Sequence, residues 1–164
     1  SDAFGAVVPF LEDTRTICAL HEWKKAGSDQ ATLRPIFNEQ RQEFIRKDTP
    51  SKLAWIKDKH GLELPLSTHI TGLESLAACL IRNDGTVPAD ATPLTFTIVS
   101  LDLVAQQAQG EQRPVQPRLG ETKKEFAPGT TASLDKVEFL NTLATIALFM
   151  NNTMRQLQQT LTQA

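Results

Sequence analysis

The chain contains no tyrosine and only two tryptophans among its 164 residues. Sites that stack nucleobases or sugar rings depend on aromatic side chains, so a site of this kind is not expected. The chain also lacks an excess of positive charge, because 17 basic residues are balanced by 19 acidic ones and the net charge is −2. Without a positive field that attracts phosphate groups, we expect no nucleic-acid partner.

Cysteines and long apolar runs are also scarce. Cys18 and Cys79 are too few for a disulfide framework, and the sequence does not decide whether they pair. No run of 18 consecutive apolar residues occurs, so no transmembrane segment is expected in this chain. The chain begins at Ser1 rather than Met, which leaves open the removal of an upstream segment and export. A cytoplasmic location is slightly favoured, and a periplasmic or exported one stays open.

The sequence motifs of phosphate-binding loops and serine hydrolases are missing. The stretch HEWKK at residues 21–25 has Lys25 where the zinc-protease helix motif requires a second histidine. Ser133 and Lys136 have the spacing of a serine nucleophile and the lysine that activates it. A serine that caps a helix accounts for the same sequence pattern. We therefore assign no catalytic residue and no cofactor, and an enzyme without a readable motif is kept as an alternative.

A metal site could be built only from residues far apart in the sequence. Cys18 and His21 share a helix face, and His69 and Cys79 could complete a zinc site if their helices pack together. Two core cysteines and two surface histidines are the simpler interpretation. No metal is therefore expected.

Apolar residues make up 40% and charged residues 22% of the chain, as is typical of one globular domain covering residues 1–164. Apolar residues recur at helical spacing in several segments that end at glycine or begin at a capping residue. The pattern predicts helices over residues 8–26, 29–47, 49–60 and 71–82. Pro35 requires the second helix to begin near Thr32, and the Thr71 to Glu74 stretch has the pattern of a capping box.

Residues 94–109 are ambiguous. Thr92-Pro93 before them and Gly110 after them are typical helix boundaries, which favours a helix. Alternation of Leu94, Phe96 and Ile98 with threonine favours a strand instead, paired with residues 62–66 or 113–119. The helix makes the domain all-α, whereas the strand makes it α+β with a small hairpin from residues 94–104.

Residues 110–133 are rich in proline and glycine and show no periodicity, so we expect a long loop. A helix should follow, capped by Ser133, with the apolar segment 137–150 at the centre of the fold. Seven of its residues alternate steps of three and four, which is the seam of a coiled coil: Leu140, Leu143, Ala147, Met150, Met154, Leu157 and Leu161. We therefore expect an irregular all-α bundle of five to six helices around a long C-terminal helix.

The function predicted from these features is a non-enzymatic helical module for protein–protein interaction or assembly. Its contact surface would combine the C-terminal helix with the loop at 110–133, and the partner would be another protein or a second copy of the chain. The expected partner-binding residues are Met154, Leu157, Leu161, Arg113, Arg118, Lys123 and Lys124. The alternative is a small-molecule-binding or sensory helical domain, in the periplasm if the chain is exported.

Overall fold

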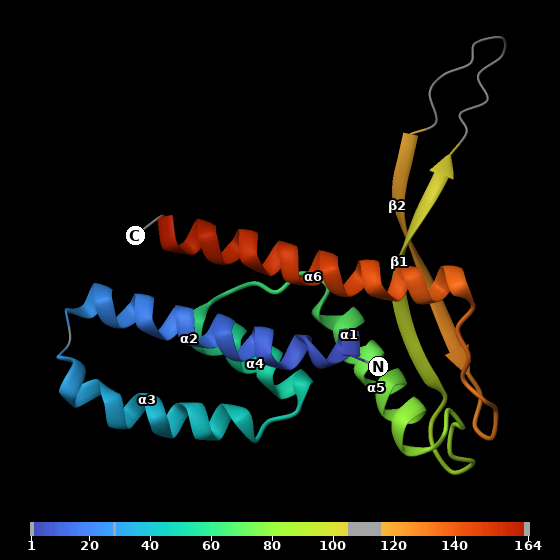
Figure 1. The fold of residues 1–164 in the computed structure, drawn as a ribbon, viewed down its shortest axis with the longest axis horizontal. Coiled ribbons are helices and arrows are strands. Elements are labelled where there is room, and N and C mark those ends of the chain that lie inside the picture. Colours follow the sequence, from blue (N-terminus) through green and yellow to red (C-terminus); the bar gives the residue numbers. More distant parts are fainter. Residues whose placement is uncertain (1, 28, 105–115, 163–164) are drawn as a thin grey trace, which may run out of the picture.

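The computed structural model describes residues 2–27, 29–104 and 116–162 of the chain (Figure 1). Its elements, in chain order, are α1 (Asp2–Gly5), α2 (Val7–Ala26), α3 (Gln30–Ile45), α4 (Thr49–His60), α5 (Ser67–Arg82), β1 (Leu94–Val104), β2 (Gln116–Phe126) and α6 (Lys136–Thr162). The expected predominance of helix is confirmed, and the sheet has two antiparallel strands. No helix in these described ranges is both long and apolar enough to cross a membrane.

The hairpin of β1 and β2 corrects the prediction for residues 94–109. The strands pair in register from Leu94 opposite Phe126 to Val104 opposite Gln116, so the helix expected from residue 94 is wrong and the hairpin alternative is right. The buried side chains of Phe96 and Ile98 alternate with the half-buried Thr95 and Thr97, as the pleat of a strand requires.

The hairpin also corrects the loop expected at residues 110–133. β2 occupies residues 116–126 of that range, and the expected partner segment 113–119 overlaps the start of β2. Residues 105–115 lie outside the described part of the chain. The proline- and glycine-rich segment therefore contains a strand. Its charged side chains are typical of a strand at the edge of a sheet.

The predicted helices are confirmed, and the one over residues 49–60 has the predicted bounds. The side chain of Asp48 caps α4 by accepting the Ser51 N–H at 2.9 Å. α5 begins at Ser67, one turn before the expected capping box, and the Thr71 hydroxyl donates to the Ser67 carbonyl instead. α3 begins at Gln30, two residues before the start at Thr32 expected from Pro35, and contains Pro35 within its length.

The long helices α2 and α6 lie side by side and run in the same direction, from the hairpin end of the molecule to the opposite end (Figure 1). Near its start α6 also packs on β1, and α5 packs on β1 as well. The approach of α5 is close because Gly72 faces the strand: a Cβ atom at Gly72 would lie 3.0 Å from the Cβ of Phe96. The core lies where these elements meet, and its fully buried members include Leu11, Ile56, Ile70, Ile98 and Phe149.

Candidate interaction site

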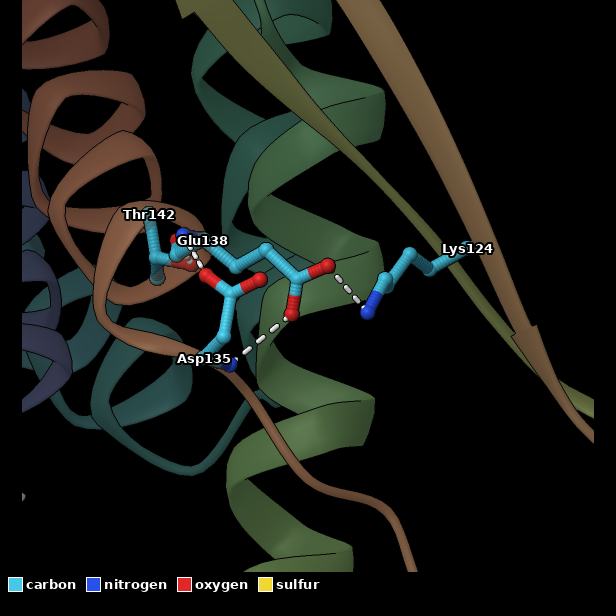
Figure 2. A network of polar contacts seen from close by, with 4 residues as sticks. All are labelled: Lys124, Asp135, Glu138 and Thr142. Carbon is cyan, nitrogen blue, oxygen red and sulfur yellow. Dashed lines mark hydrogen bonds and ion pairs between the residues drawn. The ribbon is translucent and has the colours of Figure 1, made fainter.

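The start of α6 is fixed by a network of polar contacts (Figure 2). The Asp135 carboxylate accepts the N–H of Glu138 at 2.8 Å, and the Glu138 carboxylate accepts the N–H of Asp135 at 2.9 Å. This is a reciprocal capping box, so Asp135 and not the expected Ser133 caps the helix. Glu138 also forms an ion pair with Lys124 of β2, which ties the helix start to the hairpin.

One face of α6 is buried in the molecule. Thr145, Ile146, Phe149, Thr153 and Leu157 are its buried residues, at the spacing of successive helical turns. The Thr145 hydroxyl accepts the N–H of Val99 at 2.8 Å, which attaches this face to β1. α6 is therefore held by apolar packing along its length and by polar contacts near its start.

The opposite face of α6 is exposed and largely apolar. Its eight residues, here called the α6 stripe, are Val137, Leu140, Ala144, Ala147, Asn151, Met154, Gln158 and Leu161. They alternate steps of three and four without interruption, which is the spacing of a coiled-coil seam. Val137 is 64% exposed and Leu140 53% exposed, although both residues are large and apolar. The expectation that segment 137–150 is enclosed is thus wrong for this face.

Charge is nearly absent from α6. Lys136, Glu138 and Arg155 are the only charged side chains among its 27 residues. Exposed helices of soluble proteins normally carry many charges on the solvent side. A stripe of alanine, leucine, methionine and uncharged amides can be covered by a partner at a much lower desolvation cost than a charged face.

A groove adjoins the stripe at the C-terminal end of α6. It has a volume of about 590 Å³ and lies between α2 and α6, lined by Ile17, Leu20, His21, Lys24, Lys25 and Leu161. Leu161 belongs to both the groove and the stripe, so the two form one continuous surface. Leu20 is 52% exposed and Leu161 38% exposed, which makes the groove shallow.

Among the expected partner-binding residues, those whose side chains the structure describes do not form one surface. Met154 and Leu161 are exposed on the stripe, but Leu157 is 1% exposed because it faces the protein's own core. Lys123 is exposed on β2, and Lys124 is engaged with Glu138. Arg113 lies outside the described residues, and the side chain of Arg118 is likewise not described.

Lys124 lies far from the exposed tail of the stripe. Lys124 contacts the start of α6 at Glu138, and 16 residues of helix separate Glu138 from Met154, about 24 Å at 1.5 Å per residue. Lys124 and Met154 therefore cannot contact the same small partner.

Val137, Ala144, Asn151 and Gln158 of the stripe were absent from the expected seam, although their spacing is visible in the sequence. The seam expected from the sequence shares Leu140, Ala147, Met154 and Leu161 with the stripe but also includes Leu143 and Met150, which are only partly exposed. A register beginning at Val137 would have found the exposed face. α6 has apolar residues on both faces, so its sequence is compatible with two seams. The sequence alone does not determine which of the two is exposed.

Buried polar groups elsewhere in the described part of the chain do not converge on a reaction centre. Burial and the nearby Glu22 raise the pKa of the Cys18 thiol to about 11, and Cys18 and Cys79 are both free. His69 is buried rather than on the surface, with its Nε2 3.2 Å from Glu121 Oε1. No group of three or more metal-ligating side chains occurs in the described ranges.

Comparisons with protein-family models, curated proteins and solved structures find no match to this chain.

Proposed function

We propose that this chain is a non-enzymatic interaction module that binds a protein partner through the α6 stripe. The observation that carries the proposal is the uninterrupted heptad spacing of eight exposed residues on a helix whose other face is already buried. The proposal assumes that the helices form a bundle around α6, as expected from the sequence, and that the hairpin packs on this bundle. In this arrangement the stripe is not needed for the fold and is free for a partner.

The stripe has the dimensions of a helix-docking surface. From Val137 to Leu161 it spans 24 helical steps, about 36 Å at 1.5 Å per residue. A partner helix in coiled-coil packing would place its side chains between the large residues of the stripe. The groove between α2 and α6 extends this surface by Ile17 and Leu20.

A membrane surface fits the stripe less well than a protein does. Helices that lie on membranes combine an apolar face rich in leucine and aromatic residues with a strongly basic polar face. The stripe contains no aromatic residue, and Lys136 and Arg155 are the only basic residues of α6. Asn151 and Gln158 interrupt the apolar surface with amides that a protein partner can bind by hydrogen bonds.

The alternative of a small-molecule-binding or sensory domain would rest on the groove at α2. Binding sites for small molecules usually enclose most of the ligand surface. The walls of this groove include Leu20 and Leu161, which stay substantially exposed. The groove therefore supports an extension of a protein interface better than a ligand site.

Site-specific photo-crosslinking tests the proposal in cells that express the protein. A photoreactive amino acid would replace Leu140 or Met154 on the stripe, and the matched controls would replace Gln42 on α3 or Gln159 on α6, which are exposed outside the stripe. We expect discrete protein adducts from both stripe positions and at least tenfold less adduct from both controls. The same adducts from all four positions, or none from the stripe, would contradict the proposal.

A further inference from the structure

We infer that Arg15 anchors a binding site for the phosphate group of a small molecule, and that the Phe37 ring of α3 covers this site. The site is separate from the α6 stripe. Arg15 faces α3 and lies about half a turn round α2 from Leu20 and Lys24, which line the groove beside α6. Three features support the site: a buried guanidinium without a counter-ion, a second arginine near it, and the loose packing of the helix that covers it.

The Arg15 guanidinium is buried without a counter-ion. Arg15 is 1% exposed, and its Nη1 has no hydrogen-bond acceptor. Its Nη2 donates to the Thr16 hydroxyl at 3.4 Å, a distance at which a hydrogen bond is weak. No carboxylate in the described ranges forms an ion pair with Arg15. Arginine keeps its charge in proteins, and a buried charge without a partner is strongly unfavourable. The guanidinium therefore points to a partner that the chain itself does not supply.

The nearby Lys52 shows how this chain satisfies a buried cation that serves the fold. Lys52 is 4% exposed, and its Nζ donates to the carbonyls of Ile45 and Lys47 at the C-terminal end of α3. Both cations lie beside the Phe44 ring, with 5.6 Å from its centroid to Lys52 Nζ and 5.9 Å to Arg15 Cζ. Contact with a ring does not provide an acceptor for an N–H group in the plane of the guanidinium. Arg15 therefore keeps a donor for a ligand, whereas Lys52 does not need one.

A second arginine favours an anion with more than one charge. Arg41 of α3 is exposed. Burial lowers the pKa of the Arg15 guanidinium, the positive charge of Arg41 lowers it further, and Glu12 raises it. The two arginines are thus close enough to repel each other, and a water molecule at Nη1 would not compensate their charges. A phosphate group carries about −1.5 to −2 charges at pH 7 and accepts paired hydrogen bonds from a guanidinium, so it fits two arginines better than a carboxylate does.

The cover of the site is held loosely. The Phe37 ring is half-buried, with its centroid 4.5 Å from Arg15 Cζ and 5.1 Å from the ring of Trp23. Phe44 is the one fully buried side chain among the described side chains of α3. The C-terminal end of α3 is fixed there and at Lys52. α3 lies at the outside of the molecule, with α2 between α3 and α6 (Figure 1). A movement of Phe37, or of the first turns of α3, would therefore uncover Nη1 without disturbing the packing of α2 on α6.

Phosphate titration of the unsubstituted chain and of Arg15→Met tests the site. Methionine fills a similar space without charge or donors, so Arg15→Met without phosphate should be at least as stable as the unsubstituted chain. Phosphate at ten times its dissociation constant multiplies the ratio of folded to unfolded protein about tenfold. At constant ionic strength, we expect this gain in the unsubstituted chain and in Arg82→Met, which removes an exposed positive charge from α5. Arg15→Met should show only the small general stabilisation that phosphate gives to proteins.

Tryptophan fluorescence measures the same binding directly. Trp23 and Trp55 are the two tryptophans of the chain, and they contact Phe37 and Phe44 of α3. We expect a saturable change of emission on addition of phosphate to the unsubstituted chain and no such change in Arg15→Met. Phe37→Leu makes the cover smaller and should lower the apparent dissociation constant for phosphate about threefold or more, because the open form is more populated.

Each contrary result overturns a defined part of the inference. Equal stabilisation of the unsubstituted chain and Arg15→Met, or no saturable change of emission in the unsubstituted chain, would overturn the site. An Arg15→Met chain that is much less stable without phosphate would show that Arg15 serves the fold. Acetate that acts as strongly as phosphate at the same concentration would overturn the phosphate group as ligand. Weaker phosphate binding by Phe37→Leu would overturn Phe37 as the cover. The crosslinking test of the α6 stripe is independent of all these results.

Discussion

The hydroxyl of Thr145 on α6 accepts the backbone N–H of Val99 on β1 at 2.8 Å, and it donates to the Asn141 carbonyl of its own helix at 2.7 Å. β1 has one strand neighbour, β2, in the described part of the chain, so its other edge needs partners from elsewhere. Thr145 supplies one of them from within the core. The same helix that presents the stripe to solvent therefore also supplies a hydrogen-bond acceptor to the edge of the sheet.

Thr145→Val keeps the shape of the side chain and leaves the Val99 N–H without an acceptor. A buried N–H that loses its partner costs about 1–3 kcal/mol, and we expect the free energy of unfolding to fall by that amount. Thr145→Ser retains the hydroxyl and is the control, measured by urea denaturation beside the first variant. Equal losses in both variants would show that the hydrogen bond is not the cause.

Gly72→Ala tests the close contact of α5 with β1. Alanine favours a helix over glycine by about 1 kcal/mol, but its Cβ would lie 3.0 Å from the Cβ of Phe96 and 3.1 Å from its Cα. Overpacking of this kind costs about 1–3 kcal/mol. We expect a net loss of up to about 2 kcal/mol in thermal or urea unfolding, whereas Ser75→Ala on the exposed side of the same helix should change little. A stabilised Gly72→Ala protein would mean that α5 and β1 can separate at no cost.

Asp135→Ala tests the capping box that starts α6. Removing the carboxylate leaves the Glu138 N–H without its side-chain acceptor, and the loss of such a cap costs about 1 kcal/mol. Asp135→Asn retains an acceptor oxygen and should lose less. Thermal unfolding, monitored by circular dichroism, should show stability falling from the unsubstituted protein to Asp135→Asn and then to Asp135→Ala. An alanine variant as stable as the asparagine one would argue against the cap.

Cys18 predicts a specific dependence of stability on alkaline pH. Burial and Glu22 raise the thiol pKa from 9.0 to about 11, so the folded state favours the protonated thiol. The resulting contribution to stability is complete below pH 9 and is lost as the pH rises through 11. Cys18→Ala lacks this contribution, so the difference in unfolding free energy between the two proteins should shrink between pH 8 and pH 11. Lysine titration affects both proteins alike, and a constant difference would contradict the pKa shift.

Much of the helical structure was predictable from the sequence because the signals are local. Gly27 and Gly61 end α2 and α4 in the left-handed conformation expected of glycine after a helix. The starts were less predictable because neighbouring residues compete for the same role. Asp48 and Thr49 can both cap α4, and Ser133 and Asp135 can both cap α6, and only the direction in which the chain enters the helix selects one.

The hairpin and the orientation of α6 depended on contacts between distant residues. Thr92-Pro93 suits the start of either a helix or a strand, and the strand forms because α5, α6 and β2 all cover β1. α6 has large apolar residues on two faces, so its sequence determined that it is a helix but not which face is buried. The molecule buries Phe149 and Leu157 and leaves Leu140 and Met154 in solvent, because only the first pair faces the core that α2, α5 and β1 provide.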